Sequence, residues 1–232
     1  MPSRRARQGS LVTLALLLAV AAPVGAQRDP SAVGFQAGYA SSSFQSDNAS
    51  ELLQGRQGAL VGVYFRRRLL PWLTLQPEIN FASKGGDIPL GDLLGESIEA
   101  LRLELGALEL PLLVRIAPSY RRESVRPFAF GGMSLGLEVG CSRVLLGPDF
   151  VQSVDCAASA TLDTPDGTVV LQPVDLTSPD VSWIVGGGIQ WERKDIAIGL
   201  EARFQQGLRQ VFRDGSTDLR TQLFAILIAL TI

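Results

Sequence analysis

The chain contains no histidine, and its 232 residues include only two cysteines and two lysines, Lys84 at the start of an expected loop and Lys194 in an expected turn. Histidine is the side chain that most often acts as a general base or activates a nucleophile. Its absence argues against catalysis, so we expect neither enzymatic activity nor a catalytic residue. The two cysteines show no spacing typical of a metal site, and we expect no cofactor.

Long hydrophobic runs are also missing after residue 26, where no stretch reaches the roughly 18 apolar residues that a transmembrane helix requires. The C-terminal run FAILIALTI, residues 224–232, is strongly apolar but spans only nine residues. It is too short for a spanning helix, but it matches the ~9–11 residues of a tilted spanning strand.

The N-terminal residues have the features of a cleaved export signal rather than of folded structure. Arg4, Arg5 and Arg7 form a basic segment, residues 11–22 are apolar, and small residues precede a cleavage site after Ala26. The two adjacent arginines resemble a twin-arginine signal, but the residues after them fit that pattern poorly. We therefore expect a general secretory signal at residues 1–26.

The mature chain would be a single domain, residues 27–232, with a mild excess of acidic residues. The signal removes three arginines from a total of 21 basic and 23 acidic residues, which leaves a net charge of −5. An acidic chain has no general attraction for nucleic acid, so we expect no nucleic-acid partner.

Both cysteines, Cys141 and Cys156, lie in the part of the chain that is expected to be exported. In an oxidising compartment such a pair predicts one disulfide that closes a short loop. Two free thiols are the alternative that the sequence leaves open.

Apolar and polar residues alternate with a period of two in many segments, which predicts strands rather than helices. Residues 73–81, 181–191 and 196–204 each show one apolar face and one more polar face. The pattern predicts eight strands, at about residues 32–41, 57–66, 72–83, 105–117, 125–140, 180–192, 196–206 and 220–232.

The connections between these segments alternate strictly between short and long. The short connections are residues 67–71, 118–124 and 193–195, and the long ones are 42–56, 84–104, 141–179 and 207–219. Bacterial outer-membrane barrels have short periplasmic turns, longer extracellular loops and an even number of strands. A soluble sandwich or a lipocalin has no reason for this alternation, so the sequence predicts a transmembrane barrel.

The segment LELPLLVRI, residues 108–116, shows how such a strand tolerates charge. Its even positions are Leu or Val or Ile and would face lipid, whereas Glu109 and Arg115 would face the lumen, where they can meet polar partners. Pro111 costs one ladder hydrogen bond, and a closed barrel has no edge to accommodate it. The alternation slips by one residue within 105–108, which predicts a local bulge.

Several motifs give the chain a resemblance to a known family. Residues Gly34–Gly38 match G-x-x-x-G, Leu75–Gly85 match L-Q-P-E-L-x-[YF]-x-x-K-G, and Leu108–Arg115 match L-E-I-P-L-L-x-[KR]. A P-[FY]-x-x-x-G motif starts at Pro127, and a glycine-rich strand follows. The chain thus resembles the PorT-like outer-membrane β-barrel proteins, porin-family proteins of the Bacteroidetes type. The resemblance implies the fold and the location but no settled activity. Such barrels usually end on an aromatic residue, whereas this chain ends on Ile232.

Seven charged residues are expected to point into the lumen and form its most notable constellation. They are Glu78, Glu109, Arg115, Arg126, Glu138, Glu201 and Arg203. They could act as a proton or ion relay, but eight strands leave room for side chains and little water. We therefore expect a network of ion pairs that fills the lumen.

The loops and turns offer the remaining candidates. Asp163 and Asp166 could supply oxygen ligands to calcium, but their spacing does not match an EF-hand loop, and a Pro-Asp-Gly turn is expected instead. The next segment, TVVLQPV (168–174), predicts a strand of a hairpin above the membrane. The arginines of 66–68 and 121–124 are expected to be interfacial anchors rather than binding sites for anionic headgroups.

The sequence thus predicts an all-β protein, an eight-stranded antiparallel transmembrane barrel of the bacterial outer membrane. Its expected partners are the lipid bilayer, the outer-membrane assembly machinery and an unidentified extracellular or envelope protein. The leading hypothesis is a non-enzymatic barrel that presents loops 84–104 and 141–179 for binding or supports envelope assembly. A narrow pore for small solutes is the alternative. A soluble lipocalin-like binder is less favoured, because its cavity would be apolar, whereas here the charged face points inward.

Overall fold

The computed structural model describes residues 31–46, 54–89, 100–118, 125–147, 151–164, 167–173, 179–193, 196–209 and 219–232. The expected signal peptide, residues 1–26, lies outside the described residues, so its cleavage after Ala26 stays a prediction. No helix among the described residues is long and apolar enough to cross a membrane.

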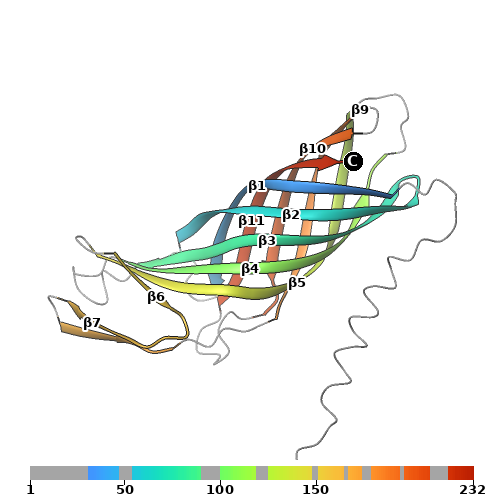
Figure 1. Cartoon of the computed structure of the whole chain (residues 1–232). Coiled ribbons are helices and arrows are strands. Elements are labelled where there is room, and N and C mark those ends of the chain that lie inside the picture. Colours follow the sequence, from blue (N-terminus) through green and yellow to red (C-terminus); the bar gives the residue numbers. More distant parts are fainter. Residues whose placement is uncertain are drawn as a thin grey trace, which may run out of the picture. The chain divides into compact units, whose positions relative to one another are not determined.

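Eight long strands form one antiparallel barrel (Figure 1). They are β1 (Ser31–Ser46), β2 (Gln54–Leu70), β3 (Leu73–Pro89), β4 (Ala100–Ile116), β5 (Val125–Leu146), β9 (Asp180–Arg193), β10 (Ile196–Gly207) and β11 (Leu219–Thr231). They pair in the order β4-β3-β2-β1-β11-β10-β9-β5, and a further pairing of β4 with β5 closes the ring. The predicted all-β fold and its eight strands are confirmed.

The links between barrel strands differ between the two ends of the barrel. The links at one end, called here the short links, are residues 71–72, 117–124 and 194–195, and the long links at the other end are 47–53, 90–99, 147–179 and 208–218. The strict alternation of lengths that the sequence predicts has one exception, because the short link 117–124 has eight residues and the long link 47–53 has seven. The short links lie at the end where β1 begins and β11 ends, and we call it the short-turn end. The opposite end is the long-loop end. At the short-turn end Val33 and Ile232 exchange two backbone hydrogen bonds, of 3.1 and 2.9 Å, which join the first strand to the last residue.

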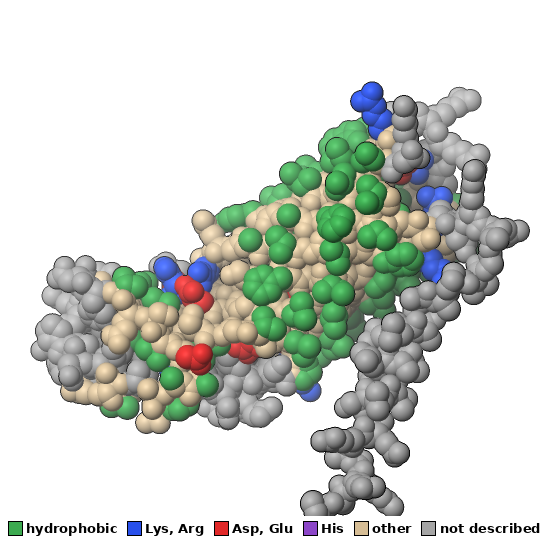
Figure 2. All heavy atoms as spheres, in the orientation of Figure 1, with side chains coloured by type: hydrophobic (Ala, Val, Ile, Leu, Met, Phe, Trp, Pro, Cys, Tyr) green, Lys and Arg blue, Asp and Glu red, His purple; other side chains and the backbone are tan. Residues whose placement is uncertain are grey.

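The apolar C-terminal run forms β11 and shows why the sequence adopts this fold. Phe224, Ile226 and Ile228 point out of the barrel and are 46%, 47% and 64% exposed, whereas Ala225 and Leu227 between them are fully buried. Similar outward rows on other strands cover the barrel with apolar side chains (Figure 2, green). Water would solvate such a surface poorly, whereas the hydrocarbon layer of a membrane suits it.

Five strands continue at least three residues further than the sequence predicts, and two of them are β1, which ends at Ser46, and β2, which begins at Gln54. β3 runs to Pro89, β4 begins at Ala100 and β5 ends at Leu146, so the predicted loops 84–104 and 141–179 are partly β-structure. A further strand, β6 (Val151–Asp155), pairs with the last residues of β5. We call the sheet formed by residues 85–89, 100–105, 140–146 and 151–155 the long-loop extension.

A separate hairpin follows the extension along the chain. It consists of β7 (Ala160–Thr164) and β8 (Gly167–Leu171), which pair with each other in antiparallel orientation. The strand that the sequence predicts at 168–174 is confirmed as β8. The proline and aspartate of its predicted turn, residues 165–166, lie outside the described residues.

The predicted irregularity in β4 is also present. The register of β4 against β5 shifts between Gly106 and Ala107, within the segment where the alternation slips. The ladder between β3 and β4 is interrupted for two residue pairs at Pro111 and resumes in the same register. Because proline has no N–H to donate, the interruption accommodates it inside a closed barrel.

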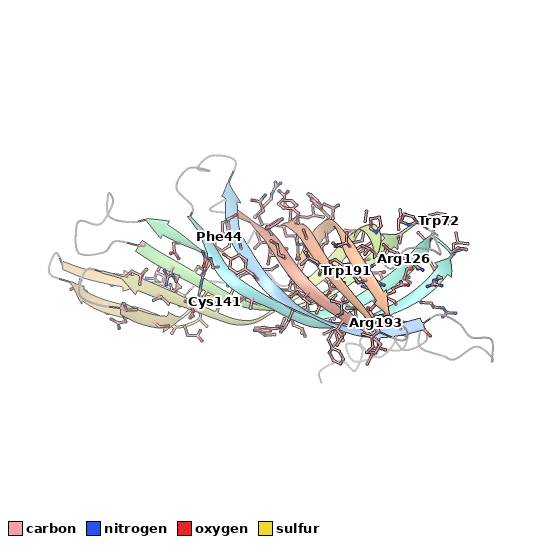
Figure 3. All side chains as sticks on the ribbon, turned by 90° about the horizontal axis from the view of Figure 1, so that it is seen from above. Phe44, Trp72, Arg126, Cys141, Trp191 and Arg193 are labelled. Carbon is pink, nitrogen blue, oxygen red and sulfur yellow. A yellow bond between two sulfur atoms is a disulfide. The ribbon has the colours of Figure 1, made fainter. Side chains whose placement is uncertain are left out.

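The predicted disulfide between Cys141 and Cys156 is present, with 5.5 Å between the two Cα atoms. It joins β5 to the turn after β6, where the backbone N–H of Cys156 also donates to the carbonyl of Cys141 at 3.3 Å. Both residues pack against Phe44, Leu103 and Leu105 (Figure 3). The bridge thus holds β6 against β5 beside a small apolar cluster.

Candidate functional site in the barrel interior

A buried ion-pair cluster lies inside the barrel. Nη1 of Arg203 on β10 is 2.9 Å from Oε2 of Glu78 on β3, and Arg203 also pairs with Glu201 on its own strand. All three side chains are excluded from solvent. Residues 201 and 203 share the inward face because side chains two positions apart on a strand point the same way. The guanidinium group of Arg203 therefore forms ion pairs with two carboxylates, one on β3 and one on β10.

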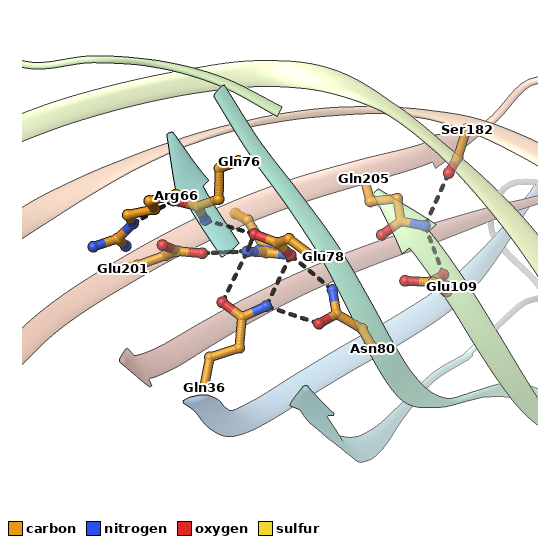
Figure 4. A network of polar contacts seen from close by, with 10 residues as sticks. Gln36, Arg66, Gln76, Glu78, Asn80, Glu109, Ser182, Glu201 and Gln205 are labelled. Atoms are coloured by element: carbon orange, nitrogen blue, oxygen red, sulfur yellow. Dashed lines mark hydrogen bonds and ion pairs between the residues drawn. The ribbon is translucent and has the colours of Figure 1, made fainter. Parts of the chain in front are cut away.

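Amide side chains complete the bonding of Glu78 (Figure 4). Nε2 of Gln36 and Nδ2 of Asn80 each donate to Oε2 of Glu78 at 2.8 Å. Nε2 of Gln76 donates to Oε1 at 2.6 Å. The carboxylate thus accepts hydrogen bonds from three amides and one guanidinium. A carboxylate bonded in this way is held in place and is a poor general base.

A second buried pair involves Glu109 on β4. Its Oε1 atom is 2.6 Å from Nζ of Lys84 on β3 and accepts from Nε2 of Gln205 at 2.7 Å. The same amide group of Gln205 donates to Oγ of Ser182 at 2.9 Å. The sequence places Lys84 at the start of a loop, and this is wrong because β3 continues to Pro89. Lys84 and Glu78 both have even residue numbers, and residues an even number of positions apart on one strand point to the same face. This alternation is the signal that could have placed Lys84 on the inward face of β3.

Two further buried arginines meet near the short-turn end. Arg66 on β2 and Arg115 on β4 both donate to Oε1 of Gln190 on β9. Nε of Arg66 also donates to Oε1 of Gln76 at 2.6 Å, which connects this group to the bonds around Glu78. The sequence predicts residues 66–68 as interfacial anchors, but Arg66 points inward and is buried. Phe65 next to it points outward, and adjacent residues of a strand point to opposite faces. This alternation is the signal that could have placed Arg66 inside the barrel.

Of the other two predicted lumen charges, Arg126 connects to the arginine group through Glu192, because Nε2 of Gln190 donates to Oε1 of Glu192 at 3.1 Å. Nη2 of Arg126 is 3.2 Å from Oε2 of Glu192, and both side chains are partly exposed at the short-turn end (Figure 3). Glu138 on β5 is half-buried, and no described residue forms an ion pair with it. Of the seven predicted charges, Glu78, Glu201 and Arg203 therefore meet in one cluster. Arg115 and Arg126 are connected through Gln190 and Glu192, whereas Glu109 and Glu138 lie elsewhere.

Aromatic rings pack inside the barrel along β5. Phe128 and Phe130 form a buried apolar cluster with residues of β4 and β9. Glycines on β9 leave the space for these rings, since a Cβ at Gly186 would lie 2.3 Å from Cζ of Phe130. A Cβ at Gly188 would lie 2.8 Å from Cζ of Phe128. The glycine-rich segment of β9 therefore leaves space inside the barrel for the rings of Phe128 and Phe130.

The described interior thus consists of bonded charges, amides and aromatic rings. Within the described residues, no group of three or more His, Cys, Asp or Glu residues could hold a metal ion. Side chains that are bonded across strands can cross-link the wall of a narrow barrel and occupy its lumen.

One protein family matches the chain over most of its length. The profile described as outer membrane protein beta-barrel domain matches residues 25–213. Among curated proteins, no sequence matches the chain significantly.

Several solved structures resemble the chain. The outer membrane protein OprG from Pseudomonas aeruginosa has a TM-score of 0.48 and 10% identity, with 88% of this chain and 95% of that chain covered. Neisserial surface protein A gives a TM-score of 0.43 and 10% identity, with 85% and 95% covered. The structure of Ail, the attachment invasion locus protein of Yersinia pestis, in complex with a heparin analogue gives a TM-score of 0.41 and 11% identity. The match covers 87% of this chain and 99% of that chain.

Proposed function

The chain belongs to the outer membrane protein beta-barrel domain family, and from this premise we propose that it is a non-enzymatic outer-membrane protein whose extracellular part binds a partner. In barrels of this type the short turns face the periplasm and the longer loops face outward. The short-turn end is then periplasmic, and the long-loop extension stands above the membrane. The lipid bilayer is the partner of the apolar outer wall.

The observation that carries this proposal is the ordered β-structure of the long-loop extension. Nε and Nη2 of Arg102 on β4 donate to the two carboxylate oxygens of Asp87 on β3, at 2.9 and 3.0 Å. The disulfide between Cys141 and Cys156 joins β5 to the turn after β6. Links of this kind pre-organise a surface, and a pre-organised surface loses less conformational entropy when a partner binds.

Arg143 on β5 extends this order to the chain around the hairpin. Its side chain is buried, and Nη1 donates to the backbone oxygen of Gln172 at 2.6 Å, just after β8. Nη2 donates to the backbone oxygen of Ala158 at 2.7 Å, between β6 and β7. Val151 and Val170, which are 73% and 57% exposed, add apolar surface that a partner can cover.

We also place the chain among the PorT-like barrels, a narrower assignment than the family. The motifs at residues 75–85 and 108–115 support it, and these motifs supply Glu78, Lys84 and Glu109 to the barrel interior. Insertion by the outer-membrane assembly machinery belongs to this proposal. A role in envelope assembly is compatible with the same binding surface.

A narrow pore for small solutes is the alternative function, and the described interior offers it no support. The ion pairs of Arg203 and the rings of Phe128 and Phe130 pack inside an eight-stranded barrel. Barrels of this size are generally filled by their own side chains. Conduction would therefore require a rearranged lumen.

Site-specific crosslinking on intact cells tests the proposed function. A photo-activated amino acid replaces Val151 in one variant and the outward-facing Ile228 of the barrel wall in a matched control. We expect a discrete protein adduct from position 151 that position 228 does not give, and loss of that adduct when Cys141 and Cys156 are both changed to Ser. Identical adducts from both positions, or protection of position 151 from a membrane-impermeant label, would contradict the proposal.

A further inference from the structure

Cations outnumber carboxylates among the inward and rim positions at the short-turn end. Arg66, Arg115 and Arg126 lie there, and Glu192 is the single carboxylate that pairs with any of them; it also accepts from Nε2 of Gln190 at 3.1 Å. Arginine side chains at this end are visible in blue in Figure 2. Since Glu192 lies 3.2 Å from Arg126, Arg66 and Arg115 have no ion pair among the described residues.

Both unpaired guanidinium groups converge on one neutral acceptor. Nη1 of Arg66 donates to Oε1 of Gln190 at 3.0 Å, and Nη2 of Arg115 donates to the same oxygen atom. The arginines are only 7% and 6% exposed. Nη1 of Arg66 also reaches Oγ1 of Thr231 at 2.9 Å. An amide oxygen and a hydroxyl carry no charge, so the two buried cations are balanced only through space, chiefly by Glu201 and Glu192, and neither carboxylate forms an ion pair with them.

Aromatic rings hold both guanidinium groups in place. Cζ of Arg66 lies 4.4 Å from the centre of the Tyr64 ring, and Cζ of Arg115 lies 3.3 Å from the centre of the Phe128 ring. Stacking of this kind is characteristic of arginine and leaves its N–H groups free to bond in the plane of the guanidinium. The two arginines are thus positioned before any ligand arrives.

One donor of this group is unused. Nη1 of Arg115 is buried and donates to no atom of the described residues. A buried charged donor without an acceptor is costly, and such an atom calls for a partner that the protein itself does not supply. Gln190 is only partly buried, so the group can be reached from the short-turn end.

We propose that Arg66, Arg115 and Gln190 form a binding site for a small soluble oxyanion at the short-turn mouth of the barrel. An oxyanion offers several negatively charged acceptors, which suit the planar donors of arginine better than a spherical ion does. It accepts from Nη1 of Arg115 and offsets the excess positive charge. Both arginines face the lumen rather than the apolar outer wall, which favours a soluble ion over a lipid headgroup.

Phosphate binding to the purified full chain in non-ionic detergent tests the site. Equilibrium dialysis with labelled inorganic phosphate at constant ionic strength, with chloride as the balancing ion, measures affinity and stoichiometry. We expect saturable binding of about one phosphate per barrel, weakened about tenfold or more in Arg115→Gln and in Arg66→Gln. Arg220→Gln removes the same charge from an exposed residue at the opposite end of the barrel and should bind as the wild type does.

A gel shift between boiled and unboiled samples checks that each variant is folded. If Arg115→Gln does not fold, Arg115→Lys keeps the charge but loses the planar fork of donors, and it should bind phosphate more weakly than the wild type. The absence of saturable binding to the wild type would overturn the proposal. An equal loss in Arg220→Gln would also overturn it, because binding would then follow the net charge of the protein.

Discussion

At Arg203 a single guanidinium group bonds to two buried carboxylates, and this ratio makes the barrel sensitive to that residue. Removing the cation leaves Glu78 and Glu201 facing each other without a positive partner in a region with little water. A buried charge whose partner is removed typically costs about 3–5 kcal/mol, whereas an exposed ion pair contributes at most about 1 kcal/mol. Position in the lumen, rather than charge alone, therefore sets the energetic importance of each residue.

We accordingly expect Arg203→Gln to lower the free energy of unfolding by about 3 kcal/mol or more. Arg126→Gln, which breaks the partly exposed pair with Glu192, should lower it by at most about 1 kcal/mol. Urea titration of the barrel in detergent or lipid, followed by the gel shift between folded and unfolded bands, measures both values. Equal costs for the two variants would show that the central cluster has no special importance.

Much of this interior could be anticipated at the level of single residues, because alternate residues of a strand point to opposite faces. The parity of a residue, that is, whether its number is even or odd, therefore assigns its side chain to one face of the strand. Parity indicates that Glu78 and Arg203 share the lumen. It does not show that Gln36 and Lys84 bond there, because those contacts depend on which strands are neighbours and on how far β3 extends. Arg66 was assigned to the interface because it stands next to two other arginines, although its parity points inward.

At the scale of elements, the packing of β9 against β5 leaves no space for a side chain at Gly186. The Phe130 ring lies over the backbone of the neighbouring strand at Gly186, where a Cβ would also lie 2.5 Å from the carbonyl oxygen of Ala202. Backbone atoms cannot move away as the end of a flexible side chain can. Position 186 therefore requires glycine, because any larger residue would collide with the backbone of the neighbouring strand.

Gly186→Ala should destabilise the barrel by about 1–3 kcal/mol, because the added methyl group overpacks the wall. Gly199→Ala on β10 is the matched control, since a Cβ there meets its nearest atom at an ordinary 3.5 Å. Its effect should stay within about 1 kcal/mol. The urea midpoints of the two variants give the comparison, and a Gly199→Ala variant as unstable as Gly186→Ala would refute the steric explanation.

The disulfide between Cys141 and Cys156 closes a loop with a sequence separation of 15 residues in the long-loop extension. A loop of that size gains about 3 kcal/mol from the bridge in the chain-entropy description. We expect the double change to Ser to make the extension markedly more sensitive to protease while leaving the gel shift of the barrel unchanged. Unchanged protease sensitivity would show that β6 is held by its pairing with β5 alone.

The sequence predicted the strands of the barrel better than those of the extension, and the reason is physical. Contact with lipid imposes strict alternation on residues such as those of β11, and alternation can be read from one sequence. The segment from Gly85 to Pro89 does not need an apolar face toward lipid, so its pairing with β4 leaves no periodic signal. The disulfide could be predicted because both cysteines lie after the expected export signal.

At the scale of the whole molecule, the outer wall and the lumen impose opposite requirements on the same strands. The outer wall matches hydrocarbon, and the lumen is occupied by ion pairs, amides and rings that bond from one strand to another. One face of each strand therefore contacts the hydrocarbon of the membrane, and the other face bonds to side chains of other strands inside the barrel. This division explains how a chain with 19% charged residues forms an apolar outer surface.

A filled lumen predicts a barrel that does not conduct. In planar bilayers with a symmetric concentrated KCl solution, we expect the folded wild type to give no steady, reproducible conductance steps, because the cluster at Arg203 and the rings of Phe128 and Phe130 occupy the lumen. A general porin inserted under the same conditions controls for the sensitivity of the recording. The gel shift on the same sample confirms that the protein was folded. Steady openings of uniform size would mean that the lumen rearranges in the bilayer, and the narrow pore would then become the leading function.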